Sequence, residues 1–260
     1  MHALPARDPA GAPAHLSRLR LTLADGARTT AHVATHPLDR TTVRVARLPA
    51  LTPLGAWCAE HEIQEALVGG FYQRDPGETF AGSPLGELWV GGVHSTSVPF
   101  MDPWSALRAC VQVTGGEVRI ARHNELPQSC AGDLLQAGPL LVRDGQVVAG
   151  DEEGFSAGAA QFDSDITEGR HPRAALGCDG ERVIALACDG RADDEAGLTI
   201  GELAEAMAGL GAREALNLDG GGSASLVCGG SLRNVPREAH GLPVPGGRAI
   251  ATALVFSARS

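Results

Sequence analysis

Lysine is missing from the sequence: all 21 basic residues among its 260 are arginine. A chain without lysine cannot use a Schiff-base lysine, a P-loop lysine or a lysine general base. Its 31 acidic residues give a net charge of −10, which argues against binding to a nucleic-acid backbone. No apolar run approaches the roughly 18–20 residues that a membrane-spanning helix needs. The chain is therefore expected to bind neither nucleic acid nor a membrane. Its 43% hydrophobic residues are enough for a sizeable globular core.

The amino terminus and the cysteines bear on the cellular compartment. Residues 1–8 lack the apolar stretch of a secretory signal, which favours a cytoplasmic location. The six cysteines form no Cys-x-x-Cys pair, and none has a histidine at zinc-finger spacing, so no structural zinc site is expected. In a chain of this length they are predicted to be buried, reduced thiols. Disulfides are the alternative if a signal segment has been removed upstream.

Two acidic runs raise the question of a metal site. Residues 151–153 are Asp-Glu-Glu, and Asp193 is followed by Asp194, a pattern that could bind calcium. Solvated loop charge is the commoner cause of such runs. We therefore predict that the protein uses neither a metal nor a cofactor.

The chain is predicted to form one domain over residues 16–260, preceded by a disordered lead-in over residues 1–15. The lead-in is rich in alanine, proline and histidine. Beyond it, no internal repeat and no linker divides the chain. A poorly periodic acidic stretch at 149–170 is predicted to be a long surface loop.

Three Asp-Gly pairs lie between apolar runs, and each predicts a β-hairpin. Further short apolar runs predict more strands. The hairpins are expected at 19–33, 140–148 and 174–188, and the other strands at 42–47, 66–68, 88–90, 111–113, 118–121 and 248–256.

Two helices are expected. Thr52 and Pro53 predict a helix to about Glu62, with threonine as the N-cap and proline at the first position. Thr199 and Glu202 form a capping box before apolar residues at helical spacing, which end at a glycine stop. This second helix lies between the apolar runs 183–188 and 215–218. The fold class is therefore α+β: a strand-rich mixed sheet with a few helices packed on it, including a C-terminal strand–helix–strand unit.

Residues 217–225 (NLDGGGSAS) are the strongest local signal for a functional site. On an extended segment Asn217 and Asp219 point the same way, so an amide and a carboxylate would face one cleft. Glycines let backbone N–H groups approach an anion closely, and hydroxyl donors follow. A tight turn is the competing interpretation, because the chain has four other Asp-Gly pairs. The residues that would bind substrate here are Asn217, Gly220, Gly221, Gly222 and Ser223.

Other residues fall at the ends of neighbouring predicted strands. Asp189 follows one strand as Asp219 follows the next, and two carboxylates at one sheet edge could divide the roles that glycoside hydrolysis requires. Arg173 could clamp a phosphate, and His171 could transfer a proton. A turn aspartate, a salt-bridged arginine and a surface histidine are the alternatives.

Two weaker patterns are set aside. The Gly-x-Ser-x-Gly run at 154–158 resembles a nucleophile elbow but follows an acidic stretch in place of a buried strand. His61-Glu62 lacks the second histidine of a zinc metalloprotease motif.

Ordered segments of the chain resemble the phosphodiester glycosidase family. Residues 217–225 are similar to the family's signature. The other matching segments are residues 66–72 (ALVGGFY), 137–145 (AGPLLVRDG), 171–177 (HPRAALG), 189–190 (DG) and 247–251 (GRAIA). In order they cover roughly residues 50–258. Three positions depart from the family pattern: Val68 stands for an asparagine, Tyr72 for a second phenylalanine and Ala174 for a threonine.

The resemblance implies a hydrolase that cleaves a sugar-1-phosphodiester at the anomeric carbon and releases free sugar, such as N-acetylglucosamine, and a phosphomonoester. Asp219, Asp189 and His171 are then the expected catalytic residues. The phosphate would be held by arginine and glycine-loop amides, because there is no lysine. The expected substrate-binding residues are Arg173, Arg248, Asn217, Gly220, Gly221, Gly222, Ser223 and, from the 66–72 segment, Gly70.

Two other functions remain open from the sequence. A non-catalytic module could recognise sugar phosphates through the same loop. A biosynthetic enzyme could act on the glycosyl phosphate of a nucleoside- or antibiotic-type metabolite. In each case the partner is a small molecule, and the oligomeric state is not indicated.

Overall fold

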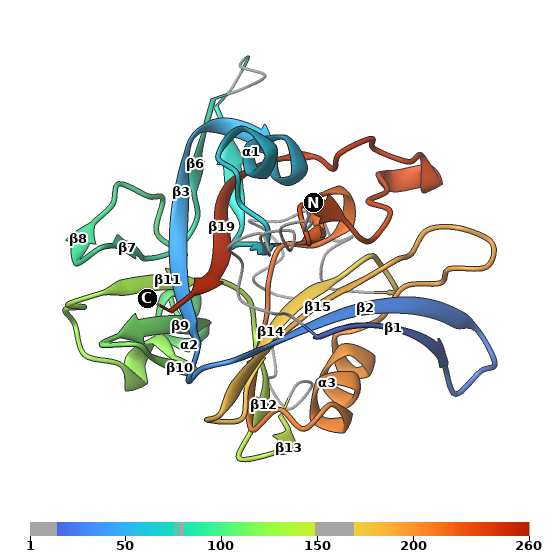
Figure 1. The fold of residues 1–260 in the computed structure, drawn as a ribbon, viewed down its shortest axis with the longest axis horizontal. Helices are drawn as coiled ribbons and strands as arrows, with labels where there is room; N and C mark the ends of the chain where they lie inside the picture. The colour runs from blue at the N-terminus through green and yellow to red at the C-terminus, as the bar shows by residue number, and fades with distance from the viewer. Residues whose placement is uncertain (1–14, 76, 78–80, 149–168, 260) are drawn as a thin grey trace, which may run out of the picture.

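The computed structural model describes residues 15–75, 77, 81–148 and 169–259. The strands form three main sheets (Figure 1). In spatial order, the first consists of β1 (His15–Thr22), β2 (Arg28–Pro37), β15 (Arg182–Cys188), β14 (Ala174–Cys178), β16 (Glu214–Asn217), β12 (Leu140–Arg143) and β13 (Gln146–Val147). The second consists of β10 (Glu117–Arg122), β9 (Ala109–Thr114), β11 (Asp133–Gln136), β7 (Leu88–Val90) and β8 (Val93–His94). The third consists of β18 (Ser231–Leu232), β17 (Leu226–Cys228), β4 (Ala66–Val68), β19 (Ala249–Ala258) and β3 (Thr41–Pro53).

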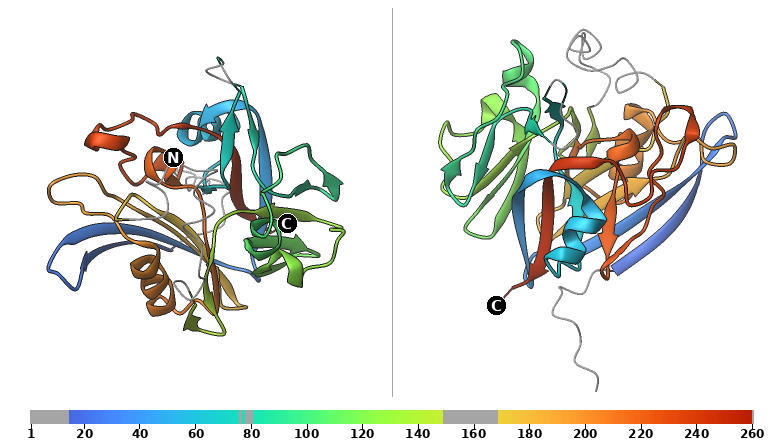
Figure 2. Two further views of the ribbon diagram at one scale, coloured as in Figure 1. Left: turned by 180° about the vertical axis from the view of Figure 1, so that it is seen from behind. Right: turned by 90° about the horizontal axis from the view of Figure 1, so that it is seen from above.

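Helices are few and short beside this amount of strand. A small hairpin and three α-helices complete the regular structure described: β5 (Tyr72–Arg74), β6 (Gly82–Pro84), α1 (Leu54–Glu60), α2 (Trp104–Leu107) and α3 (Ile200–Gly209). Figure 2 shows the second sheet on one side of the molecule and the β1–β2 hairpin on the other. The predicted α+β, strand-rich class is confirmed.

Among the described strands, every neighbouring pair within a sheet runs antiparallel. The expected mixed sheet is therefore replaced by antiparallel ones. The strand–helix–strand unit is β15–α3–β16, and both of its strands pair with β14. Since each is antiparallel to β14, β15 and β16 run in the same direction and end at the same edge. The start of β14 lies between these two ends.

The middle strands of the first sheet, β14 and β15, are buried on both faces, which explains their continuous apolar runs. Alternate residues of β14 and β15 separate into two cores. Leu176 and Ala185 belong to the large core shared with the other two sheets. Ala175 and Ile184 belong to a second core against α3. Side chains alternate across a strand, so a strand covered on both faces reads as an unbroken hydrophobic run.

The local signals predicted the three hairpins and the start of α3. All three Asp-Gly hairpins form, as β1–β2, β12–β13 and β14–β15. The Thr199–Glu202 capping box has both of its hydrogen bonds. The first helix begins one residue later than expected: Pro53 is the N-cap, and Thr52 lies in β3, where its hydroxyl donates to the Ala50 carbonyl.

Some predictions fall partly or wholly outside the described residues. These are the lead-in up to residue 14, the surface loop over 149–168, the acidic run 151–153 and the Gly-x-Ser-x-Gly run. His15, which was assigned to the lead-in, begins β1. All six cysteines are free thiols and buried, as predicted.

Candidate active site

The topology of the first sheet brings three of the predicted site residues to one edge. Asp189 follows β15, Asp219 lies two residues after the end of β16, and Arg173 immediately precedes β14 between them. The order of the strands alone therefore brings two carboxylates and a guanidinium to the same end of the sheet.

Pro172 lies between the two Asp-Gly turns. A Cβ on Gly190 would lie 2.7 Å from the Pro172 nitrogen, and a Cβ on Gly220 would lie 3.0 Å from its carbonyl oxygen. That carbonyl accepts a hydrogen bond of 2.8 Å from the Gly221 amide. Glycine follows each aspartate because the backbone at 172 leaves no room for a side chain on either turn.

Asp219 is buried, and both its backbone amide and its carboxyl are hydrogen-bonded to the backbone. Its amide donates to the Gly69 carbonyl (3.0 Å), at the end of β4, and its Oδ1 accepts from the Gly220 amide (2.9 Å). Burial raises the pKa of Asp219 to about 6, an effect that the Ser223 hydroxyl and the Arg248 charge oppose and the Glu238 charge reinforces. Near neutral pH this group can both give and take a proton.

Arg248 and Glu238 form an ion pair beside this carboxyl. Arg248 Nε donates to Glu238 Oε1 (2.8 Å), and Nη2 donates to Oε2. The hydrogen bonds and charge of Arg248 hold the pKa of Glu238 below its usual value. The Glu238 carboxylate lies over Gly222, since a Cβ there would be 2.9 Å from Oε1. The hydrogen bond with Glu238 raises the pKa of Arg248 most, and the charges of Asp219 and Tyr72 raise it further, so these side chains lie around the guanidinium.

Three buried polar atoms of the 217–225 segment lack hydrogen-bond partners among the described residues. They are Asn217 Oδ1, Ser223 Oγ and Ser225 Oγ. The Ser223 hydroxyl lies close enough to Asp219 to lower its pKa, although it makes no hydrogen bond of regular geometry. Buried polar atoms without partners are costly, and ligands or water commonly satisfy them. This segment is thus built to receive a polar ligand.

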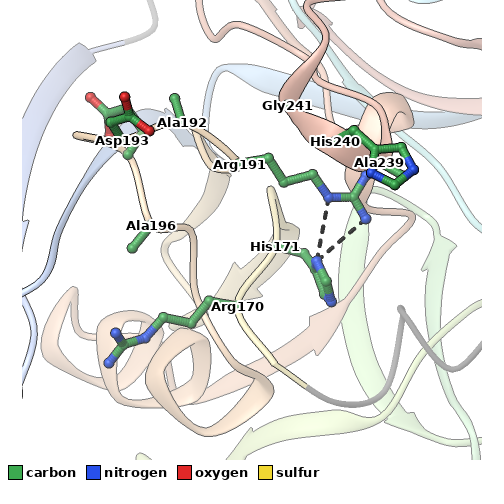
Figure 3. Close-up of a pocket in the computed structure, with 10 residues that line it drawn as sticks. Arg170, His171, Arg191, Ala192, Asp193, Ala196, Ala239, His240 and Gly241 are labelled. Carbon is green, nitrogen blue, oxygen red and sulfur yellow. Dashed lines mark hydrogen bonds between the residues drawn. The ribbon is translucent and has the colours of Figure 1, made fainter.

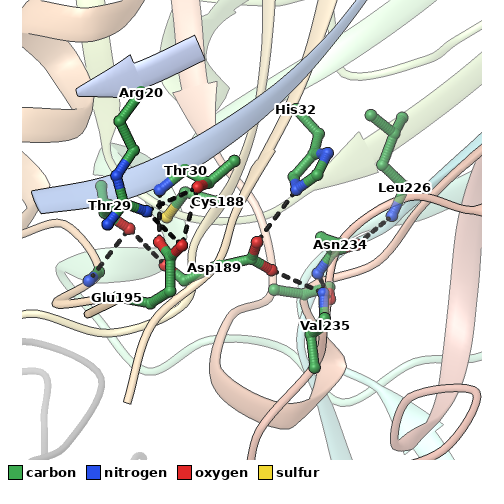
Figure 4. A network of polar contacts seen from close by, with 12 residues as sticks. Arg20, Thr29, Thr30, His32, Cys188, Asp189, Glu195, Leu226, Asn234 and Val235 are labelled. Carbon is green, nitrogen blue, oxygen red and sulfur yellow. Dashed lines mark hydrogen bonds and ion pairs between the residues drawn. The ribbon is translucent and has the colours of Figure 1, made fainter. Parts of the chain in front are cut away.

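Asp189 is buried and both of its carboxylate oxygens have partners (Figure 4). Oδ2 lies 3.0 Å from His32 Nε2, and Oδ1 accepts a 2.6 Å bond from the Val235 amide. Its carbonyl accepts from the Thr29 hydroxyl (2.8 Å). Asp189 thus fastens the edge of the first sheet to the loop that carries Glu238.

The same network fixes the loop after Asp189. Glu195 accepts from the Thr30 amide (2.6 Å), from the Thr30 hydroxyl (2.8 Å) and from Arg20. Farther along, Asn234 holds the glycine-rich segment by accepting from the Leu226 amide at 3.0 Å (Figure 4). Side chains of β1 and β2 therefore position the 189–197 loop.

Arg173 is 1% exposed and donates to backbone carbonyls. Nε donates to Leu198 at 3.0 Å, and Nη2 donates to Gly169 at 3.2 Å. Burial, with a smaller effect of the Arg191 charge, lowers the pKa of Arg173 to about 10. A buried cation of this kind would be stabilised by an anion that reached it.

His171 lines a pocket of about 500 Å³ with Arg191 and His240 (Figure 3). Arg191 Nε and Nη2 lie 3.4 and 3.3 Å from His171 Nδ1. Arginine has only N–H donors, so Nδ1 must accept and the ring proton of neutral His171 is on Nε2. Arg191 and His240 both have left-handed backbones (φ 59° and 66°), uncommon for residues other than glycine and often seen at functional sites.

Gly70 lies near the site, at the end of β4. Its amide donates to the Thr252 hydroxyl (3.0 Å), and a Cβ there would be 3.0 Å from the Gln136 carbonyl. Gly69, which the sequence did not single out, is closer to Asp219 and more constrained, since its Cβ would lie 2.4 Å from the Thr252 hydroxyl. Val68, where the family pattern has asparagine, is fully buried in the large core.

The sequence missed three residues of this region: Gly69, Arg191 and Glu238. Gly69 and Arg191 adjoin motifs that were recognised, and adjacency to them was the only signal. Glu238 lies in the 233–247 segment, where no motif marks it, and only the fold brings it to Gly222 and Arg248.

Neither a metal cluster nor a membrane-crossing helix is found in the described part of the chain. Its residues include no group of three or more His, Cys, Asp or Glu side chains arranged to hold a metal ion. None of its helices is long and apolar enough to cross a membrane.

The site thus combines the buried, protonatable carboxyl of Asp219 with the Glu238–Arg248 ion pair at the glycine-rich segment 217–225. Such a combination is suited to acid–base chemistry on an anionic ligand. The family model of the phosphodiester glycosidases matches residues 61–257, and the chain belongs to that family.

Two curated relatives carry one name, N-acetylglucosamine-1-phosphodiester alpha-N-acetylglucosaminidase. The mouse (Mus musculus) protein is 30% identical over 106 residues, which are 40% of this chain and 20% of that protein. The cattle (Bos taurus) protein is 27% identical over 178 residues, 65% of this chain and 32% of that protein. The matched part therefore spans a third or less of these longer relatives.

Solved structures share the fold at low identity. The zebrafish N-acetylglucosamine-1-phosphodiester alpha-N-acetylglucosaminidase catalytic domain, auto-inhibited by its pro-peptide, superposes with a TM-score of 0.71 at 19% identity, covering 98% of this chain and 85% of that one. A hypothetical protein from Synechocystis gives a TM-score of 0.63 at 18% identity, covering 94% and 62%. A putative exported protein from Burkholderia pseudomallei gives 0.62 at 16%, covering 89% and 74%.

Proposed function

We propose that the protein hydrolyses a sugar-1-phosphodiester at the anomeric carbon, releasing free sugar and a phosphomonoester. The observation that carries this proposal is the Asp219 carboxyl, buried beside Arg248 at the glycine loop, whose pKa is raised to about 6. Family membership and the names of the relatives support the same reaction class.

The chemistry suits the residues of the site. A phosphate leaving group departs readily, so it needs a clamp for its charge more than a strong acid. Arg248 and the Gly220–Gly222 amides would supply that clamp, with Arg173 behind them. Asp219 in its protonated form would give its proton to the departing phosphate oxygen as the anomeric C–O bond breaks. Water would then form the new bond to the anomeric carbon and return a proton to the Asp219 carboxylate.

N-acetylglucosamine is proposed as the sugar, from the names of the relatives. Asn217 Oδ1, which has no partner among the described residues, would accept a hydrogen bond from a sugar hydroxyl or from the acetamido N–H. The Nε2–H tautomer of His171 would donate to an oxygen of the phosphate side of the substrate.

The test is hydrolysis of the methyl phosphodiester of N-acetylglucosamine-1-phosphate, followed as release of reducing sugar. The wild-type protein is expected to release sugar. Asp219→Asn is expected to lose about 10²–10⁴-fold in rate. Asp39→Asn, at an exposed site remote from the loop, serves as the control and should match the wild type. Circular dichroism and thermal unfolding would show that each variant is folded.

The same assay separates the alternatives. Binding of the phosphodiester without turnover by the wild type would favour a sugar-phosphate-binding module. Turnover only with other sugars or leaving groups in a panel would favour a biosynthetic enzyme. Full activity of Asp219→Asn would contradict the assigned role of this carboxyl.

A further inference from the structure

Glu238 is held in the candidate site by its backbone as well as by its charge. Its amide donates to the Leu242 carbonyl (2.9 Å), and its own carbonyl accepts from the Gly241 amide (3.1 Å). Arg191 Nη1 donates to the preceding carbonyl, that of Arg237, at 3.1 Å. This local turn fixes where the carboxylate points.

The segment leading to Glu238 is fastened to both neighbouring parts of the site. The Val235 amide donates to Asp189 Oδ1 at 2.6 Å. The Asn234 side chain accepts from the Leu226 amide and donates to the Ala224 carbonyl (2.7 Å). Asp189 and Asn234 thus act as positioning residues for the loop, and the carboxylate of Glu238 reaches Gly222 because of them.

Asp219 and Glu238 are two carboxyls with opposite surroundings. Burial raises the pKa of Asp219. The Glu238 side chain is 38% exposed, and its pKa is lowered by the hydrogen bond from Arg248 and then by the charges of Arg248, Arg191 and Arg74. Each of the two also affects Arg248, so the guanidinium lies between them electrostatically. Pairs of carboxyls whose surroundings favour different protonation states divide acid and anion roles in glycosidases.

We propose that Glu238, over Gly222 and paired with Arg248, is the second catalytic carboxylate: the ionised group that faces the anomeric carbon and stabilises its positive charge in the transition state. This inference rests on the proposed hydrolysis of a sugar-1-phosphodiester. A guanidinium has five N–H donors, so Arg248 can hold Glu238 through Nε and Nη2 and still donate to the phosphate. The role is distinct from that of Asp219, which gives the proton.

The alternative is a purely structural ion pair, and the chain contains a matched control for it. Glu125 and Arg143 form an ion pair whose side chains are 36% and 33% exposed, against 38% and 33% for Glu238 and Arg248. The control pair involves β12 and the turn after β10, away from the glycine loop. Glu125→Gln removes the same kind of contact without touching the site.

The experiment measures kcat and KM for sugar release by the wild type, Glu238→Gln, Glu238→Ala and Glu125→Gln. Glu238→Gln is expected to lose at least about 100-fold in kcat with little change in KM, while Glu125→Gln stays near the wild type. Sodium azide or formate should restore part of kcat to Glu238→Ala, because a small anion can occupy the place of the missing carboxylate.

Three results would overturn the proposal. Wild-type kcat in Glu238→Gln would mean that the ionised group is not needed. A gain in kcat or in phosphate affinity would mean that Glu238 blocks the anion site. A loss in Glu238→Ala with no response to azide or formate would mean a structural role. If the wild type itself released no sugar, the proposed function would fail first, and that result is separate from the variants.

Discussion

At the scale of single residues, the burial that raises the pKa of Asp219 also lowers the stability of the folded protein at neutral pH. This carboxyl has a pKa of about 6 in the folded protein, against an ordinary value of 3.8. The folded state therefore binds the proton more tightly than the unfolded state. The contribution of Asp219 to the free energy of unfolding is fully present below about pH 4. It falls as the pH rises to about 6 and stays lower above that pH.

Asp219→Asn should for this reason stabilise the protein at neutral pH while it lowers the rate of the proposed sugar release. The shift of about two pKa units corresponds to about 3 kcal/mol, gained above pH 6 and absent near pH 4. Urea unfolding at pH 4 and pH 7.5 measures it. If the free energy of unfolding differed between variant and wild type by the same amount at both pH values, burial would not raise the pKa of Asp219.

The sequence identified some of these residues and not others. The glycine loop and Asp219 were found because chemistry and spacing lie in one short segment. Glu238 and Arg191 could not be found in this way. Their importance depends on contacts with Gly222, Arg248 and His171, which the chain forms only when it folds.

At the scale of elements, the two Asp-Gly turns and Pro172 act as one unit. Gly220 has an ordinary extended φ of −125°, so its requirement is space and not backbone conformation. A Cβ on Gly220 would lie 3.0 Å from the Pro172 carbonyl oxygen, and a Cβ on Gly190 would lie 2.7 Å from the Pro172 nitrogen. Either methyl group must displace residue 172.

Gly190→Ala is expected to destabilise the protein by about 1–3 kcal/mol, the usual cost of overpacking, and Gly220→Ala by less. Gly55→Ala is the control, since a Cβ there, in helix α1, has no neighbour within 4 Å. That substitution should be neutral or stabilise by up to about 1 kcal/mol. Chemical denaturation ranks the three variants. Equal stability of Gly190→Ala and Gly55→Ala would contradict the contact with Pro172.

Elements set by local signals were predictable, and their partners were not. Asp-Gly turns fixed three hairpins, and Thr199 with Glu202 fixed the start of α3. In contrast, the pairing of β2 with β15 joins Val33 to Leu186, and no local pattern encodes it. The strand-rich α+β class was predicted correctly, but the strands pair antiparallel in three main sheets in place of the mixed sheet expected, because direction and order depend on such distant pairs.

At the scale of the whole molecule, the first and third sheets meet at a buried histidine. His36, in β2, stacks on Phe256, in β19, with ring centroids 4.3 Å apart. Neither ring nitrogen has a hydrogen-bond partner among the described residues. Burial lowers the pKa of His36 to about 4 from 6.5.

His36 should therefore reduce the stability of the protein as the pH falls from about 6.5 to about 4, opposite in sign to the effect of Asp219, because the unfolded chain takes up a proton at His36 and the folded one does not. The loss from this group is about 3 kcal/mol. His36→Phe should remove this loss, so the unfolding free energy at pH 4.5, relative to that at pH 7, should be higher in the variant than in the wild type. Comparing the two pH values within each protein cancels the packing change. An unchanged difference would exclude His36 as its cause.

The support of Asp189 by β2 has a consequence for where the protein can be cut. Sequence similarity to the family begins at residue 61, yet His32 and Thr29 hold Asp189, and Arg20 and Thr30 hold the loop after it. A fragment trimmed to the matched range would lose two strands of the first sheet and release the segment that leads to Glu238. The range that the family model matches is thus shorter than the part of the chain that supports the site.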